Sequence, residues 1–150
     1  MSLYAIALFV HIVGAMLLIV LLALEGFTLP SGQGAPRLNR ILGPISLVAL
    51  LVPGFYMAAQ TGWRAWTAVG LASYAVIAGL GAYTGIMTPR GRMSAGAAAI
   101  SWLVRVGIAL GVVFDMTVKP EAIGSLAAVA VGIGLALAAA VPTVRLARLT

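Results

Sequence analysis

Long apolar runs separated by short polar segments make up most of the chain. Four runs without a charged residue are long enough to cross a membrane: Met1–Leu24, Ile41–Trp63, Ala65–Pro89 and Ala122–Val144. About 20 apolar residues in a helix span the hydrocarbon core of a bilayer, which is about 30 Å thick. Each run therefore predicts a transmembrane helix.

A fifth apolar run, residues 97–118, contains Arg105 and has Asp115 near its end. We predict that it also crosses the membrane, because the charges of the loops then separate clearly. With five spans, Arg64 and Lys119 lie on one side. The other side carries six basic residues: Arg37, Arg40, Arg90, Arg92, Arg145 and Arg148. With four spans, the C-terminal arginines would change sides and blur this asymmetry.

The predicted fold is an all-α polytopic membrane bundle of about five helices. The spans cover about residues 3–27, 41–62, 65–88, 97–118 and 122–144 of a single transmembrane domain, 1–150. Basic residues collect in cytoplasmic loops, so we expect the C-terminus in the cytoplasm and the N-terminus outside. Tyr4, Trp63 and Trp66 then fall at the outer boundary, where aromatic rings are enriched.

Composition supports a membrane protein and excludes several other classes. Apolar residues make up 63% of the chain and charged residues 8%, against about 25% charged in soluble domains. The nine basic residues are scattered, without the patch that nucleic-acid binding requires. There is no cysteine, which excludes disulfides, thiolate metal sites, iron–sulfur clusters and c-type haem attachment.

The abundance of Ala, Gly and Arg suggests a bacterial source, and therefore the inner (plasma) membrane. The first run has no basic segment before it and reaches the length of a full span. We therefore expect a retained first helix, not a cleaved signal peptide.

Small residues and one proline suggest how the spans pack. Gly81 and Gly85 form one GxxxG motif, and Gly107 and Gly111 form another. Such motifs join helices within one chain or between two protomers. Pro53, followed by a glycine, predicts either a packing kink or a broken helix that lines a site.

Arg105 is the most unusual residue of the spans, because a charge at the bilayer centre needs a partner. Glu25 lies about 10 Å away in depth by helical rise, a gap that two long side chains can bridge. Tyr83 lies at a similar depth and is a second candidate. We consider a structural ion pair, a ligand or ion site, and an arginine that snorkels to the cytoplasmic interface while stacked on Trp102.

His11, the single histidine, lies in the outer half of the first span. Asp115 falls at a neighbouring depth, which predicts a His11–Asp115 hydrogen bond. Met57 and Met116 lie in the same half. Imidazole with thioether sulfurs suits copper(I), and an axial imidazole suits haem. A hydrogen-bonded structural histidine, a metal or haem ligand, and a proton relay all remain open.

The sequence lacks HExxH, GxSxG and P-loop motifs and a dinucleotide fingerprint in a βαβ setting. With three acidic residues and one histidine, a hydrolytic site is hard to assemble. We expect no enzymatic activity, although a membrane enzyme that relies on a cofactor stays open.

The stretch Leu8–Ala15, with His11 inside it, resembles the opening of the first helix in two groups. One is the CopD-type copper-resistance membrane proteins, and the other is a family of small, uncharacterised bacterial integral membrane proteins. The stretch Arg105–Pro120 resembles the fourth helix of the second group. CopD-type proteins are longer and have more candidate ligands, so the resemblance implies a ligand role for His11 alone.

We therefore expect a transport-related or accessory membrane component that works in the lipid bilayer, as a homo-oligomer or with a membrane-complex partner. Arg105, Glu25, His11 and Asp115 would form buried polar pairs. A haem- or copper-binding protein with His11 as ligand is the first alternative, and a structural subunit of a larger complex is the second.

Overall fold

A computed structural model describes residues 2–28 and 37–146, with side chains for 2–28 and 39–139. Arg37, Arg145 and Arg148, which the predicted charge balance includes, lie outside the described side chains. The described residues form five helices: α1 Leu3–Thr28, α2 Arg37–Thr61, α3 Ala65–Met87, α4 Ala95–Val118 and α5 Ala122–Leu146. The helix limits lie close to those of the predicted spans.

All five helices are long and apolar enough to cross a membrane, which fits a multi-pass membrane protein. Large apolar side chains also cover the outside of the bundle: Phe9 is 66% exposed, Ile123 85% and Leu135 67%. Such a surface is costly in water and needs no polar cover in lipid. The all-α fold with five candidate spans is confirmed.

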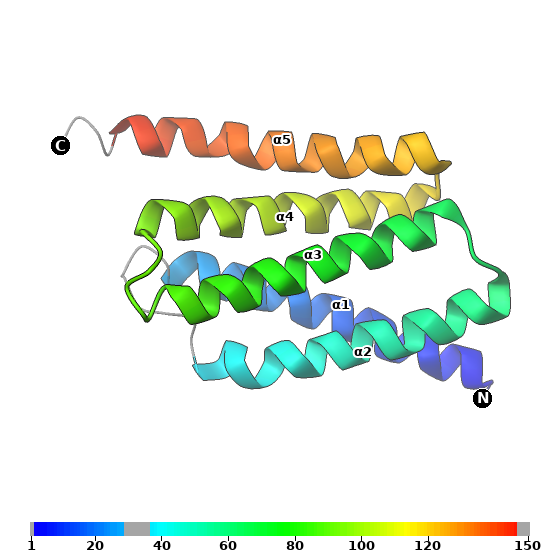
Figure 1. Cartoon of the computed structure of the whole chain (residues 1–150). Helices are drawn as coiled ribbons and strands as arrows, with labels where there is room; N and C mark the ends of the chain where they lie inside the picture. The colour runs from blue at the N-terminus through cyan, green and yellow to red at the C-terminus, as the bar shows by residue number, and fades with distance from the viewer. Residues whose placement is uncertain (1, 29–36, 147–150) are drawn as a thin grey trace.

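The helices run alternately up and down the bundle, so that the start of α1 and the end of α5 lie at opposite ends of it (Figure 1). Short connections produce this order. Gly62, with φ of 85°, begins the connection from α2 to α3, and Lys119, with φ of 54°, ends α4 in the left-handed conformation. Ser94 begins α4 by accepting the N–H of Ala97 at 3.2 Å, which satisfies one of the free donors of the first turn.

Two helix pairs make close backbone contacts. In α1 and α2, Gly14 faces Ala49, and the Ser46 hydroxyl donates to the Gly14 carbonyl at 3.2 Å. In α4 and α5, Gly107 lies against the backbone of Gly132. These contacts depend on residues without a bulky side chain, as expected where lipid provides no hydrophobic drive for association.

α3 packs against α4 and completes the core. The hydroxyls of Thr84 and Ser101 hydrogen-bond across this interface at 2.8 Å. A small apolar cluster at the centre joins α1, α3 and α4, and consists of Leu22, Ile77, Ile108 and Ala109. The core therefore lies on the side of α3 that faces α1 and α4. Fewer side chains pack between α2 and α3.

Candidate functional site

Arg105 and Glu25 form a buried ion pair between the middle of α4 and the C-terminal part of α1. The guanidinium donates from Nη1 to Glu25 Oε2 at 2.8 Å and from Nη2 to Oε1 at 2.5 Å. Arg105 is 3% exposed and Glu25 6%. Two parallel N–H···O bonds are the strongest geometry available to this pair of side chains. The predicted Glu25–Arg105 pair is confirmed.

The surrounding helices hold the guanidinium in place. Its Nε donates to the Ser101 carbonyl one turn earlier at 3.3 Å. On α3, Gly81 leaves the space that the guanidinium occupies, since a Cβ there would lie 3.2 Å from Nη1. Trp102 fixes the crossing of α1 and α4 by donating from its indole N–H to the Leu22 carbonyl at 2.7 Å. Arg105 therefore points into the bundle and does not snorkel along Trp102.

Tyr83 does not take part in this network, and the expectation that it partners Arg105 was wrong. The tyrosine is 52% exposed. Two residues correspond to about 200° around a helix. Because Gly81 faces the guanidinium, Tyr83 points away from it.

His11 is bonded to α2. Its Nδ1 lies 2.9 Å from the Leu50 carbonyl, which can only accept, so Nδ1 carries the proton. The ring rests on Gly54, where a Cβ would lie 3.3 Å from His11 Cε1. α2 continues as a helix through Pro53, so the broken-helix interpretation was wrong. Gly54, which has no side chain, instead gives the imidazole room beside the helix.

Asp115 does not bond to His11, and this expectation was also wrong. The aspartate is fully buried, and neither of its carboxylate oxygens has a hydrogen-bond partner among the described residues. The N-terminal half of α1 follows α2 and diverges from α4 (Figure 1). Equal depth in the membrane therefore does not place His11 and Asp115 side by side.

Met116 lies apart from His11, whereas a role for Met57 as a ligand beside His11 stays a prediction. Met116 packs its methyl group on Gly70 of α3, whereas His11 contacts α2. Within residues 2–28 and 37–146, no three His, Cys, Asp or Glu residues are grouped as metal ligands. Copper or haem binding at His11 stays a prediction.

The two GxxxG motifs have different roles. Gly107 and Gly111 face α5: a Cβ would lie 2.6 Å from the Gly132 carbonyl oxygen at the first and 2.6 Å from Val129 Cα at the second. This motif joins helices within one chain. At Gly85, by contrast, a Cβ would meet nothing within 4 Å.

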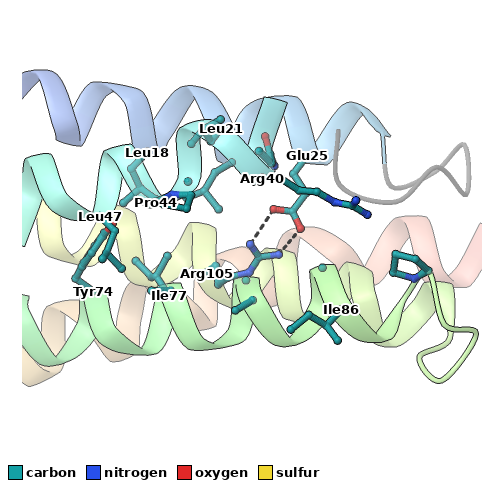
Figure 2. A pocket seen from close by; sticks show the side chains of 18 of the residues that line it. Leu18, Leu21, Glu25, Arg40, Pro44, Leu47, Tyr74, Ile77, Ile86 and Arg105 are labelled. Atoms are coloured by element: carbon teal, nitrogen blue, oxygen red, sulfur yellow. Dashed lines mark hydrogen bonds and ion pairs between the residues drawn. The ribbon is translucent and has the colours of Figure 1, made fainter. Parts of the chain in front are cut away.

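A cavity of about 660 Å³ lies between α1, α2 and α3, with the ion pair in its wall. Figure 2 shows Leu18, Leu47, Tyr74 and Ile77 around the space, with the bonded Glu25 and Arg105 toward one end. The described lining consists of Leu18, Leu21, Leu22, Glu25, Asn39, Arg40, Gly43, Pro44, Leu47, Tyr74, Ile77, Ala78, Gly81, Ala82, Gly85, Ile86, Pro89, Arg90 and Arg105. Its volume falls in the range of about 300–1,000 Å³ that is typical of small-molecule sites.

Two of the charged lining residues, Glu25 and Arg105, were predicted from the sequence, whereas Arg40 and Arg90 were interpreted as topology signals only. Asn39 was not singled out. These three residues stand at the start of α2 and just after α3, where polar residues are ordinary at a membrane surface. The sequence carries no signal that brings them to one cavity.

Protein-family models, curated protein sequences and solved structures were all compared with the chain, and none of them matches it.

Proposed function

We propose that the chain is a small, non-enzymatic integral membrane protein, a transport-related or accessory component that binds a largely apolar molecule in the cavity between α1, α2 and α3. The cavity itself carries this proposal. Its walls are mainly apolar, and its charged groups include the buried Glu25–Arg105 pair. An apolar pocket with a few fixed polar groups is the usual form of a small-molecule site.

The ion pair gives the cavity a wall that is polar but does not attract one charge strongly. Each charge is matched by the other through two hydrogen bonds. An apolar ligand made of methylene groups or rings can contact Leu18, Leu47 and Ile77 while the hydrogen bonds of the ion pair stay intact. The pair then holds α1 against α4 at the edge of the cavity, while the apolar walls bind the ligand.

A small, uncharged photoreactive probe, trifluoromethyl-phenyldiazirine, tests the cavity in proteoliposomes. Tyr74 lines the cavity and is 9% exposed, so bulk lipid does not reach most of its surface. We expect saturable labelling of Tyr74 in the wild type. The labelling should decrease severalfold in Ala78→Phe, because the introduced phenyl ring fills the cavity. Lipid-facing Phe9 should be labelled equally in both proteins.

Ala127→Phe is the matched control, since Ala127 is exposed on α5 and does not line the cavity. It should leave the labelling of Tyr74 unchanged. Unlabelled Tyr74, or equal labelling in the wild type and Ala78→Phe, would show that the cavity does not admit the probe.

We also propose that the N-terminus lies outside and the C-terminus in the cytoplasm of a bacterial inner membrane. Support comes from the excess of basic residues at one end of the bundle and from the aromatic residues at the other. At the second end, the Lys119 ammonium lies 5.6 Å from the centre of the Trp66 ring, and Trp63 packs edge-on against Phe55. Tryptophans at a membrane boundary fit this assignment.

A second candidate function is haem or copper binding at His11, and the bond to Leu50 favours it. Metal-binding histidines usually donate their other ring N–H to a carbonyl or carboxylate. In the neutral ring, the Nδ1–H bond to Leu50 leaves Nε2 free as the ligand. The purified protein should then show a Soret band or bound copper that is lost in His11→Ala. A purified protein that is colourless and copper-free, and that binds neither haem nor copper when they are added, would exclude this candidate.

Assembly into a homo-oligomer, or with a larger membrane complex as a structural subunit, stays part of the proposal. Because Gly107 and Gly111 are used within the chain, such an assembly would have to use another surface.

A further inference from the structure

Positive charges outnumber negative charges in the cavity lining, and the excess lies at one end of the cavity. Four charged residues line it: Glu25, Arg40, Arg90 and Arg105. Glu25 and Arg105 neutralise each other in their ion pair. One negative and three positive charges give a net charge of +2 for the lining, and this excess comes from Arg40 and Arg90.

Arg40 and Arg90 belong to neighbouring helix ends and are both exposed. Arg40 lies in the first turn of α2, and Arg90 follows the end of α3 at Met87. Their exposure leaves both guanidiniums able to contact a group at the membrane surface. Guanidinium groups bind phosphate through charge-assisted, often bidentate hydrogen bonds.

The cavity becomes apolar with distance from these arginines. Along α2, Gly43, Pro44 and Leu47 follow Arg40 on the lining. Seven residues from Arg40 to Leu47 correspond to about 10 Å along a helix. On the facing helix, Ile86 precedes Arg90, and Ile77 lies deeper. A positive mouth that leads into an apolar interior matches a molecule with an anionic head and a hydrocarbon chain.

Asn39 adds an independent polar feature beside the mouth. It lines the cavity, and its buried Oδ1 has no hydrogen-bond partner among the described residues. Buried acceptors of this kind are rare, and each one needs an explanation. An amide oxygen accepts a hydrogen bond, so it suits a ligand that carries a hydroxyl next to its anionic group.

We propose that the cavity binds an anionic phospholipid with a hydroxyl-bearing headgroup of the phosphatidylglycerol type. Its phosphate contacts Arg40 and Arg90, a headgroup hydroxyl donates to Asn39, and one acyl chain follows the apolar wall toward Ile77. This inference rests on the proposed function, because it names the class of molecule that occupies the same cavity.

The alternative is that Arg40 and Arg90 only orient the chain in the membrane. Arg92 distinguishes the two explanations. It lies in the same loop as Arg90 and is exposed, but it does not line the cavity. As an orientation signal Arg92 equals Arg90, whereas as a lipid ligand it should have no role.

The test is native mass spectrometry of the full chain released from nanodiscs that contain equal amounts of phosphatidylglycerol and phosphatidylcholine. We expect one retained phosphatidylglycerol per chain in the wild type. The double variant Arg40→Gln/Arg90→Gln should lower its retention by about tenfold or more, because two charged hydrogen-bond donors are removed. Arg92→Gln should retain the lipid like the wild type, and Asn39→Leu should weaken the preference for a glycerol headgroup.

Equal retention of both lipids, an equal loss in Arg92→Gln, or no retained lipid in the wild type would each overturn this inference. Labelling of Tyr74 by the uncharged probe in the same proteins separates this result from the proposed function. If Tyr74 is still labelled in the wild type and this labelling falls in Ala78→Phe, the cavity binds an apolar molecule of another class. If Tyr74 labelling also fails, the proposed function fails with it.

Discussion

Glu25→Ala should lower the free energy of unfolding by about 3–5 kcal/mol, the cost of breaking one buried ion pair from one side. The substitution leaves the Arg105 guanidinium buried without its two carboxylate acceptors, and only the Ser101 carbonyl remains to it. Reversible unfolding by SDS in mixed micelles, followed by circular dichroism, measures this loss. Arg105→Ala should have an effect of similar size, because it leaves the carboxylate unpaired instead.

A double variant separates the pair's own contribution from the cost of an unpaired charge. Glu25→Leu/Arg105→Met removes both charges and keeps most of the volume, so it should regain most of the lost stability. Glu121→Ala is the control for a change in net charge, since Glu121 is exposed between α4 and α5, and it should shift stability by less than about 0.5 kcal/mol. A Glu25→Ala protein as stable as the Glu121→Ala control would contradict a stabilising pair.

The same variants bear on the cavity. Glu25 and Arg105 join α1 to α4, and both line the space between α1, α2 and α3. If the pair's role is structural, the Leu/Met double variant should still admit the photoreactive probe at Tyr74. Loss of labelling in a protein that remains stable would instead assign the two charges a direct part in ligand binding.

Hydropathy predicted the helices well because a bilayer imposes one length and one polarity on every span. The pairing of Arg105 with Glu25 was also within reach of the sequence. With three acidic residues in the chain and a high cost for an unpaired intramembrane charge, few partners were possible, and depth selected one of them. Strong energetic constraints with few solutions are what a single sequence expresses most clearly.

The failed expectations share a different cause. Depth along the membrane follows from residue number, but the direction of a side chain around its helix and the neighbours of that helix do not. His11 and Asp115 have similar depths, yet α1 packs on α2 at His11. The predicted contact between Tyr83 and Arg105 was wrong for the same reason. The cavity also depends on the space between α2 and α3, a property of the assembled bundle that no local pattern reports.

The two GxxxG motifs show the same limit of the sequence, which does not tell which helix a motif faces. Substitution in one of them should have the second large effect on stability. At Gly107, any added side chain meets the backbone of α5, with the Gly132 carbonyl oxygen 2.6 Å and Ile133 Cα 2.6 Å from the Cβ position. Backbone atoms cannot rotate away as a flexible side chain can. Gly107→Ala should therefore force α4 and α5 apart and lower stability by about 1–3 kcal/mol, the usual cost of overpacking.

Gly85→Ala is the matched control, because it makes the same change in the other motif at a position where a Cβ meets nothing within 4 Å. Glycine is also a poorer helix former than alanine by about 1 kcal/mol, so this control should be neutral or slightly stabilising in the same SDS titration. The difference between the two variants then measures the helix contact free of helix propensity. If the two variants proved equally stable, α4 and α5 would not be in close backbone contact at Gly107. Destabilisation by Gly85→Ala alone would instead indicate that the first motif packs against a second protomer.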